Sequence, residues 1–274
     1  MTSVLDSIIQ GVKEDLAVRK NSVSLSELKS QVNDVPRALP AADLLHKNSF
    51  SVISEVKRAS PSKGHLSEIP DPASLAMAYQ TGGAQVISVL TEQRKFNGNL
   101  SDLDAVRRKV SIPILRKDFM VDEYQVWEAR AHGADVILLI VAGLSDSQLS
   151  ELNQLADELG MSVLVEVHDE PELHRALAIN PKLIGVNARN LKTLEVSLDV
   201  CHNLIPQIPD HVLAIAESGI SSAEQVQALV LSGARAVLVG EALVTGNMNW
   251  LKGQPLVGLR CYLHLSQQKI LMLQ

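Results

Sequence analysis

Residues 136–167, VILLIVAGLSDSQLSELNQLADELGMSVLVEV, contain the repeating unit that decides the fold. The first six and the last six of these residues are largely aliphatic, as in strands that are buried on both faces of a parallel sheet. The segment between them opens with Ser145 and Asp146, which are typical helix N-caps, and Gly160 follows it, as glycine often follows a helix. The stretch therefore predicts a strand, a helix and a second, parallel strand.

The same pattern recurs in both directions along the chain. Eight aliphatic runs are expected to be strands, and they are Ser51–Lys57, Val86–Thr91, Ile112–Asp118, Val136–Val141, Ser162–Val167, Leu183–Ala188, Leu213–Ser218 and Ala236–Gly240. Segments with helical spacing lie between them, at Asp71–Thr81, Asp122–His132, Leu144–Leu159, Asp169–Ile179 and Ser221–Leu231. Eight β/α repeats predict an α/β fold, a single (β/α)8 or TIM barrel at residues 51–245. A doubly wound open sheet is the alternative, but fewer strands and a GxGxxG turn would favour it, and the sequence contains no GxG.

Both flanks of the predicted barrel differ from the repeats. Residues 1–50 are expected to form an N-terminal helical extension, with an amphipathic helix in Met1–Arg19 and a second helix in Ser24–Val32. Residues 246–274 are expected to be an atypical C-terminal tail, with only a short, late helix or a loosely docked segment, because glycine and proline oppose a helix before residue 256.

Composition and charge exclude several classes of protein. Hydrophobic residues make up 46% of the 274 residues and charged residues 20%, as in ordinary soluble globular proteins, and the net charge of −6 does not indicate a nucleic-acid-binding surface. The two cysteines form no CxxC pair, so neither a disulfide scaffold nor a zinc site is expected. The longest apolar run is too short to span a bilayer, and the first residues do not resemble a secretory signal. We therefore expect a cytoplasmic protein that binds neither nucleic acid nor membranes.

The predicted strands end in charged residues, at the end of the barrel where active sites lie. Because side chains alternate along a strand, Glu55 and Lys57 share one face, and so do Asn187 and Arg189. If these faces point into the barrel, six charged groups meet in its mouth, namely Glu55, Lys57, Lys117, Glu166, Arg189 and Glu217. One charge at a strand end is most often a solvated rim residue, whereas six with matching parity would be costly to bury unless they pair. A mixed cluster of acids and bases favours proton-transfer chemistry.

Other polar features near the predicted mouth admit both a functional and a structural interpretation. Gly219 and Gly240 lie at the ends of the last two strands, the usual phosphate site of these barrels, although each is also consistent with a simple turn. Residues 60–64, SPSKG, form a polar loop that is either a lid or anion clamp or only a loop. His168 and His174 do not form a metal-binding pattern and the sequence has no HExxH, so metal catalysis is not expected.

Seven motifs resemble the signature of the indole-3-glycerol-phosphate synthase family, in order and spacing, from about residue 3 to residue 245. They are EVKRASPSKG at 55–64, ISVLTE at 87–92, LRKDF at 115–119, LVEVH at 164–168, GVNARNL at 185–191, AESG at 216–219 and VGE at 239–241. The resemblance implies a (β/α)8 lyase of tryptophan biosynthesis. Such an enzyme converts 1-(2-carboxyphenylamino)-1-deoxyribulose 5-phosphate into indole-3-glycerol phosphate, carbon dioxide and water, without a metal or cofactor.

The resemblance also implies roles for single residues. Lys117 is the implied general acid for the substrate ketone, and we expect a nearby Lys57 to ease its deprotonation by like-charge repulsion. Glu166 is implied as the principal catalytic carboxylate, with Glu55 and Glu217 in the same pocket, and which glutamate handles which proton stays open. The implied substrate-binding residues are Lys57, Ser60, Asn187, Arg189, Ser218 and Phe96, and the implied phosphate-binding residues are Lys57, Gly219, Gly240 and Glu241.

Two further interpretations stay open at this point. Another phosphosugar barrel, such as phosphoribosylanthranilate isomerase, is expected to carry a cysteine at the end of the first strand, and this chain has none there. An inactive relative that only binds a phosphosugar or a partner protein is the third interpretation. It rests on the tail, where no acidic residue follows Ala242 and the family's last amphipathic helix is replaced. We expect no fused second domain, and the resemblance leaves association with other tryptophan-pathway enzymes open.

Overall fold

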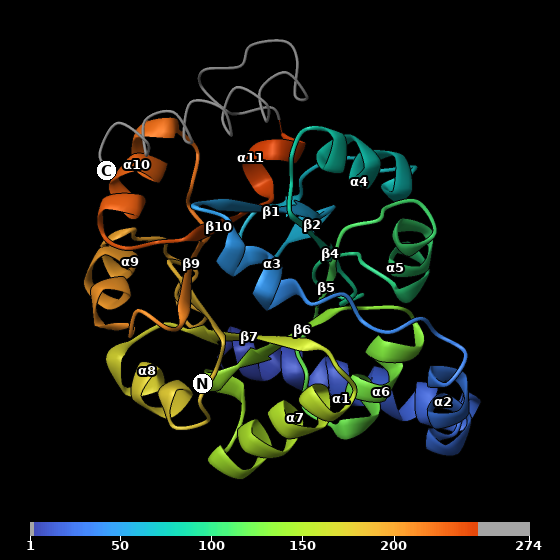
Figure 1. The fold of residues 1–274 in the computed structure, drawn as a ribbon. Helices are drawn as coiled ribbons and strands as arrows, with labels where there is room; N and C mark the ends of the chain where they lie inside the picture. The colour runs from blue at the N-terminus through green and yellow to red at the C-terminus, as the bar shows by residue number, and fades with distance from the viewer. Residues whose placement is uncertain (1–2, 246–274) are drawn as a thin grey trace.

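The structure, a computed structural model, describes residues 3–245 and contains a closed barrel of eight parallel strands (Figure 1). The strands are β1 (Ser51–Val56), β4 (Val86–Leu90), β5 (Ile114–Lys117), β6 (Val136–Ile140), β7 (Ser162–Val167), β8 (Leu183–Asn187), β9 (Leu213–Glu217) and β10 (Ala236–Val239). The ring closes where β10 pairs with β1, with Ser51 opposite Ala236. The predicted (β/α)8 barrel is confirmed, and each of the eight predicted runs contains a strand. An open sheet is excluded because the ring is closed and leaves none of its eight strands at an edge.

Helices surround the ring on its outside (Figure 1). They are α4 (Pro72–Thr81), α5 (Leu100–Arg107), α6 (Glu123–Ala131), α7 (Asp146–Glu158), α8 (Glu170–Leu177), α9 (Asp199–Leu204), α10 (Ala223–Leu231) and α11 (Glu241–Val244), with 3-10 turns η1 (Val141–Gly143) and η2 (Ile205–Gln207). All five predicted inter-strand helices are present, and Ser145 caps α7 by accepting a hydrogen bond from Gln148 N. The sequence does not predict α5, α9 and α11. The six and four residues of α9 and α11 are too short to show a helical period.

The inside of the barrel is layered along its axis. Apolar side chains from several strands form one buried cluster in the interior, and they include Ile53, Leu115, Leu164 and Ile215. Two positions further along the same strands lie Glu55, Lys117, Glu166 and Glu217. Because side chains alternate along a strand, these charged residues face the same way as the apolar ones. The apolar layer therefore lies deeper in the barrel, beneath a polar layer at the carboxyl ends of the strands.

The amino-terminal end of the barrel is closed by α3 (Ala41–Lys47), a helix that the sequence does not predict. Its Ala41 and Leu45 are buried in the interior cluster, and Ala42 N donates to Ser162 Oγ at the start of β7 over 3.2 Å. Figure 1 looks onto this end, with α3 over the centre of the ring.

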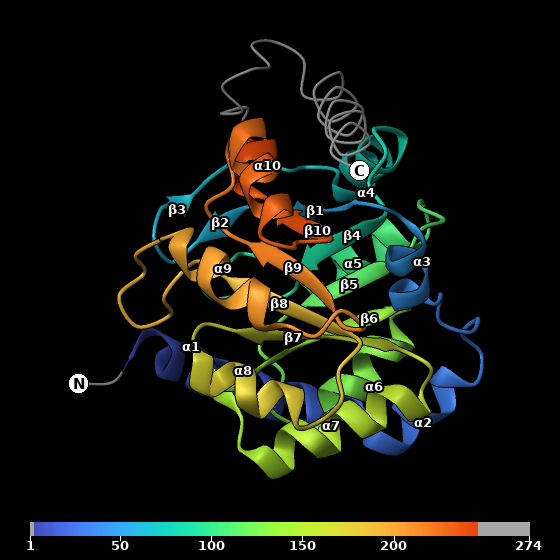
Figure 2. The ribbon, with the colours of Figure 1, turned by 60° about the vertical axis from the view of Figure 1, so that its left-hand side comes forward.

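The opposite, carboxyl end is bordered by α1 (Val4–Ser22), which is followed by α2 (Leu25–Val32); both helices were predicted. The α1 side chains Leu5, Ile8 and Val12 are buried in the interior cluster. A short hairpin, β2 (Ala59–Ser60) with β3 (Gly64–His65), follows β1 at this end, so the predicted polar loop is the turn of a hairpin. Figure 2 shows α1 and the hairpin on one side of the barrel and α3 on the other.

The predictions for residues 246–274 lie outside the described residues. Within residues 3–245, no helix is long and apolar enough to cross a lipid bilayer.

Candidate active site

A cavity of about 600 Å³ opens at the carboxyl end of the barrel. Its polar lining comes from the strand ends and includes Glu55, Lys117, Glu166, Asn187 and Glu217. Its apolar lining includes Leu5 and Ile8 of α1, Leu191, and the rings of Phe96 and Phe119, whose centroids lie 6.0 Å apart. The cavity thus combines a charged floor with an apolar wall, as expected of a site for an aromatic, anionic small molecule.

The charged groups on the floor are paired with one another. Lys117 Nζ lies 3.0 Å from Glu166 Oε2 and 3.6 Å from Glu217 Oε2. Lys57 Nζ lies 2.9 Å from Glu55 Oε1. Five of the six charged residues predicted to meet in the mouth therefore form ion pairs there, which offsets the cost of burying them.

Neutral side chains complete the hydrogen bonding of two of these carboxylates. Asn187 Nδ2 donates to Glu166 Oε1 over 3.0 Å, and Ser88 Oγ donates to Glu55 Oε2 over 3.1 Å. Each of the two carboxylates is therefore oriented from two sides. The sequence singled out Asn187 but not Ser88, because the distance along the chain gives no sign that Ser88 faces Glu55.

The expected effect of Lys57 on Lys117 is wrong. Lys57 is paired with Glu55 instead of lying free beside Lys117. Burial alone would lower the pKa of Lys117, but the charges of Glu166, Glu217 and Glu55 outweigh it and raise this pKa above its ordinary value. Lys117 is therefore held in its ammonium form.

Glu166 and Glu217 share Lys117 but differ in protonation. Burial would raise the pKa of Glu166, yet Lys117, His168 and Asn187 together hold it well below its ordinary value. Burial raises the pKa of Glu217 instead, and the neighbouring charges of Glu166 and Glu55 add to this shift despite the opposing charge of Lys117. Two carboxylates whose pKa values are pushed apart in this way suit the roles of a base and an acid.

Two glycines make room for these carboxylates. A Cβ on Gly185 of β8 would lie 1.9 Å from Glu217 Oε1, and one on Gly240 would lie 2.5 Å from Glu55 Oε1. Neither position accepts a larger residue without moving a catalytic candidate. Gly185 is not among the residues predicted from the sequence, although an isolated glycine within a strand is a sign of close approach.

Arg189 is the one member of the predicted six that lies at the rim. Its Nη1 donates to Ser62 Oγ over 2.9 Å and to Leu194 O over 3.1 Å, and its Nη2 lies 3.9 Å from Glu241 Oε2. Glu241 also pairs with Lys63 of the hairpin turn. The rim thus joins three loops through polar side chains.

Four of the candidate phosphate ligands directly follow two neighbouring strands, β9 and β10. Ser218, Gly219, Gly240 and Glu241 all line the cavity, as does Ser60 of the hairpin. Ser218 has a φ of 67° and Gly219 one of 73°, so a tight turn follows β9. A non-glycine residue in this conformation is strained, and such strain is concentrated at functional sites. Phosphate binding itself stays a prediction.

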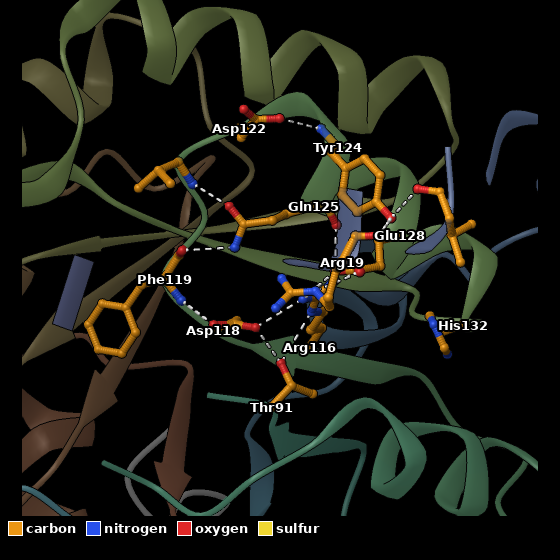
Figure 3. Close-up of polar contacts among 12 residues, drawn as sticks. Arg19, Thr91, Arg116, Asp118, Phe119, Asp122, Tyr124, Gln125, Glu128 and His132 are labelled. Carbon is orange, nitrogen blue, oxygen red and sulfur yellow. Dashed lines mark hydrogen bonds and ion pairs between the residues drawn. The ribbon is translucent and has the colours of Figure 1, made fainter. Parts of the chain in front are cut away.

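Outward-facing neighbours of Lys117 anchor its strand (Figure 3). Arg116 is fully buried and lies 3.0 Å from Asp118 Oδ2 and 2.9 Å from Glu128 Oε2 of α6. Asp118 accepts a hydrogen bond from Thr91, which directly follows β4, and Arg19 of α1 donates to Glu128 Oε1 over 2.8 Å. The network therefore connects the N-terminal helix α1 to the strand that carries Lys117.

Replacing Glu128 with alanine should destabilise the protein by about 3 kcal/mol, because Arg116 would keep its charge in the core with one partner removed. Urea unfolding at neutral pH measures the change. Glu151→Ala, on the exposed face of α7, is the matched control and should change stability by less than about 0.5 kcal/mol. Equal stability of the two variants would show that the network contributes nothing net.

Among the described residues, the His, Cys, Asp and Glu side chains form no group that could hold a metal ion.

Comparison with known proteins identifies close relatives. Residues 5–250 match the family model described as indole-3-glycerol phosphate synthase. A protein of that name from Paenarthrobacter aurescens (strain TC1) is 56% identical over 248 residues, which cover 89% of this chain and 91% of the relative. Another, from Rhodococcus jostii (strain RHA1), is 56% identical over 243 residues, covering 89% and 90%. A third, from Streptomyces griseus subsp. griseus, is 54% identical over 244 residues, covering 89% and 91%.

Proposed function

The chain belongs to the indole-3-glycerol phosphate synthase family, and we propose that its paired charges around Lys117 carry the individual steps of the reaction. It is a carboxy-lyase of tryptophan biosynthesis that acts on a small phosphorylated substrate. The isomerase and the inactive relative, the two alternatives left open by the sequence, are thereby set aside. The observation that carries the proposal is the Lys117 ammonium, buried between Glu166 and Glu217 on the cavity floor.

Ring closure is the first step. A ring carbon of the anilino group attacks the ribulose ketone, and Lys117 gives its proton to the ketone oxygen as the new bond forms. The carboxylate then leaves as carbon dioxide, and its bonding electrons restore the aromatic ring. Lys117 supports this role because its neighbours raise its pKa and keep it protonated until the ketone oxygen gains negative charge.

Loss of the new hydroxyl is the second step, and it needs an acid and a base. Glu217 supplies the proton that turns the hydroxyl into water, because its raised pKa favours the protonated form. Glu166 removes the proton from the adjacent carbon, because its lowered pKa keeps it ionised. The separation of the two pKa values supports this division of roles between the glutamates, which the sequence leaves open.

Binding uses the remaining groups of the cavity. Arg189 holds the substrate carboxylate, and Lys57 is a second anion ligand. The aromatic ring lies against Phe96, and Asn187 positions the substrate beside Glu166. Backbone N–H groups at Gly219, Gly240 and Glu241, with the hydroxyls of Ser60 and Ser218, bind the phosphate.

One assay tests the function as a whole. Purified protein should convert the carboxyphenylamino substrate into a product with indole fluorescence, and carbon dioxide should be released in equal amount. A folded protein that forms neither product would contradict the proposal.

Inorganic phosphate should inhibit this reaction competitively, and Gly240→Val should raise both KM and the inhibition constant of phosphate about tenfold or more. The valine would occupy the approach to the backbone donors, and it would also displace Glu55, so kcat should fall as well. The phosphate inhibition constant isolates the anion site, because free phosphate makes no use of Glu55. Leu231→Val, at an exposed position at the end of α10, is the control and should leave this constant unchanged. An unchanged constant in Gly240→Val would place the phosphate elsewhere.

We also propose a cytoplasmic location, which the buried, free Cys201 supports because thiols persist in reducing compartments. Association with other tryptophan-pathway enzymes is a further part of the proposal, and co-purification from cell extract tests it.

A further inference from the structure

His168 lies between the carboxylate of Glu166 and a second carboxylate, that of Glu172. It follows Glu166 by two residues, just after β7, so both side chains lie on the same side of the chain. His168 Nε2 is 3.3 Å from Glu166 Oε1, an ion pair that lacks the geometry of a hydrogen bond. His168 Nδ1 is 2.9 Å from Glu172 Oε2. No step of the proposed mechanism uses this largely buried histidine.

Glu172 is itself fixed in place. It lies in the first turn of α8, and its Oε2 also accepts a hydrogen bond from the His168 backbone N over 2.9 Å. Its own backbone N donates to the N-cap residue Asp169 over 2.9 Å. The imidazole ring is therefore held from behind by the start of a helix, with Nε2 directed at the active site.

Both ring nitrogens of His168 face carboxylates, an arrangement that suits a doubly protonated ring. Burial would lower the pKa of His168, but its contacts with Glu166 and Glu172 outweigh burial and raise the pKa to about 10. His168 is thus a fixed positive charge in contact with Glu166.

We propose that His168 is a positioning residue for Glu166, which holds Oε1 of this carboxylate and keeps the group ionised until it accepts its proton in the second step. The inference rests on the proposed role of Glu166 as the base. Oε1 faces His168 and Asn187, whereas Oε2 faces Lys117. Two groups thus hold one oxygen, and the other stays on the side of the reacting groups.

The need for a second cation follows from the chemistry of Lys117. When Lys117 gives its proton to the ketone oxygen, it becomes a neutral amine, and Glu166 loses the charge that pairs with Oε2. Burial then opposes an ionised Glu166, because a buried carboxylate without a cation has a raised pKa. Of the contacts that residues 3–245 make with Glu166, His168 then supplies the remaining positive charge. It keeps Glu166 able to accept a proton in the second step.

His168→Gln tests the inference because glutamine keeps a donor near Nε2 and removes the charge. We expect kcat to fall by about tenfold or more, as for the loss of a charge-assisted contact, while KM changes by less than about threefold. Without the cation the pKa of Glu166 rises, so the acidic limb of the kcat profile should move to higher pH.

Glu172→Gln gives an independent readout and leaves the histidine in place. Loss of the Glu172 charge lowers the pKa of His168, so kcat should gain an alkaline limb as His168 becomes neutral. Turnover should return to the wild-type value at a pH below that limb. A merely structural role for Glu172 would lower kcat equally at all pH values and would overturn the inference.

The matched control is His174→Gln, the same change at an exposed position on α8, which should leave kcat and its pH profile unchanged. A His168→Gln variant with wild-type kcat and acidic limb would show that His168 does not act on Glu166. If that variant does not fold, the pH profile of Glu172→Gln alone decides. Should Glu166→Gln be fully active, the role of Glu166 fails, and this result is distinct from a failure of His168 alone.

Discussion

Lys117→Ala should lower kcat by a factor of about 10²–10⁴, the usual contribution of general acid catalysis, while the substrate still binds. Alanine removes the proton that the ketone oxygen needs during ring closure. The residues proposed to bind the substrate phosphate and carboxylate lie elsewhere in the cavity, so KM should change much less than kcat. Steady-state kinetics with indole fluorescence measure both constants.

The same substitution has an electrostatic side effect. Glu166 and Glu217 share the Lys117 ammonium, and without it their carboxylates would repel each other. Lys117→Arg separates this effect from proton donation, because arginine keeps the charge but does not release a proton near neutral pH. We expect Lys117→Arg to unfold at nearly the wild-type urea concentration and yet to be as inactive as Lys117→Ala.

Lys182→Ala, an exposed lysine before β8 at the other end of the barrel, is the control for loss of a lysine and should be fully active. If Lys117→Ala keeps more than about half of the wild-type turnover, or if Lys117→Arg restores it, the role of Lys117 as general acid is wrong.

The barrel and the members of the charged cluster could be predicted because both follow from local patterns. Strand periodicity and glycine after helices define the repeats, and side-chain alternation places Glu55, Lys117, Glu166 and Glu217 on one face. These relations involve residues a few positions apart, and the closed ring then brings the strand ends together. The family resemblance added the chemistry, which alternation alone does not specify.

The pairing within the cluster could not be predicted, because it depends on which long side chains reach one another across the mouth. Lys57 pairs with Glu55, two residues before it in the chain, instead of lying free beside Lys117. The Arg19–Glu128 contact joins residues 109 positions apart, and the periodicity of apolar residues along the sequence cannot predict such a contact. Helix α3, which closes the amino-terminal end of the barrel, could not be predicted either, because its seven residues span less than two helical turns.

Glu166→Gln should reduce kcat by a factor similar to that for Lys117→Ala while the barrel stays folded, because glutamine keeps the shape of the side chain and removes the proton acceptor. Circular dichroism and urea unfolding establish the fold, and fluorescence kinetics give kcat. Inactivity that arises only through unfolding would support a structural role instead.

The pH dependence of the free energy of unfolding distinguishes the two carboxylates around Lys117. The folded-state pKa of Glu166 is depressed, so its ionised form stabilises the protein above the ordinary value of 4.5, and this contribution is lost as the pH falls through the folded-state pKa. Glu166→Gln should therefore be less stable than the wild type at pH 7, with the difference shrinking in acid.

The pKa of Glu217 is raised instead of lowered, which makes Glu217→Gln the matched control for Glu166→Gln. Its folded-state pKa lies above 4.5, so between the two values the folded protein resists an ionisation that the unfolded chain accepts, and stability is lost as the pH rises. Its Oε1 also lacks a hydrogen-bond partner among the described residues. Glu217→Gln should thus be more stable than the wild type at pH 7 and no more stable at pH 4. If both glutamine variants shift stability in the same direction at pH 7, the two carboxylates share one protonation state, and the assignment of Glu166 as base and Glu217 as acid is wrong.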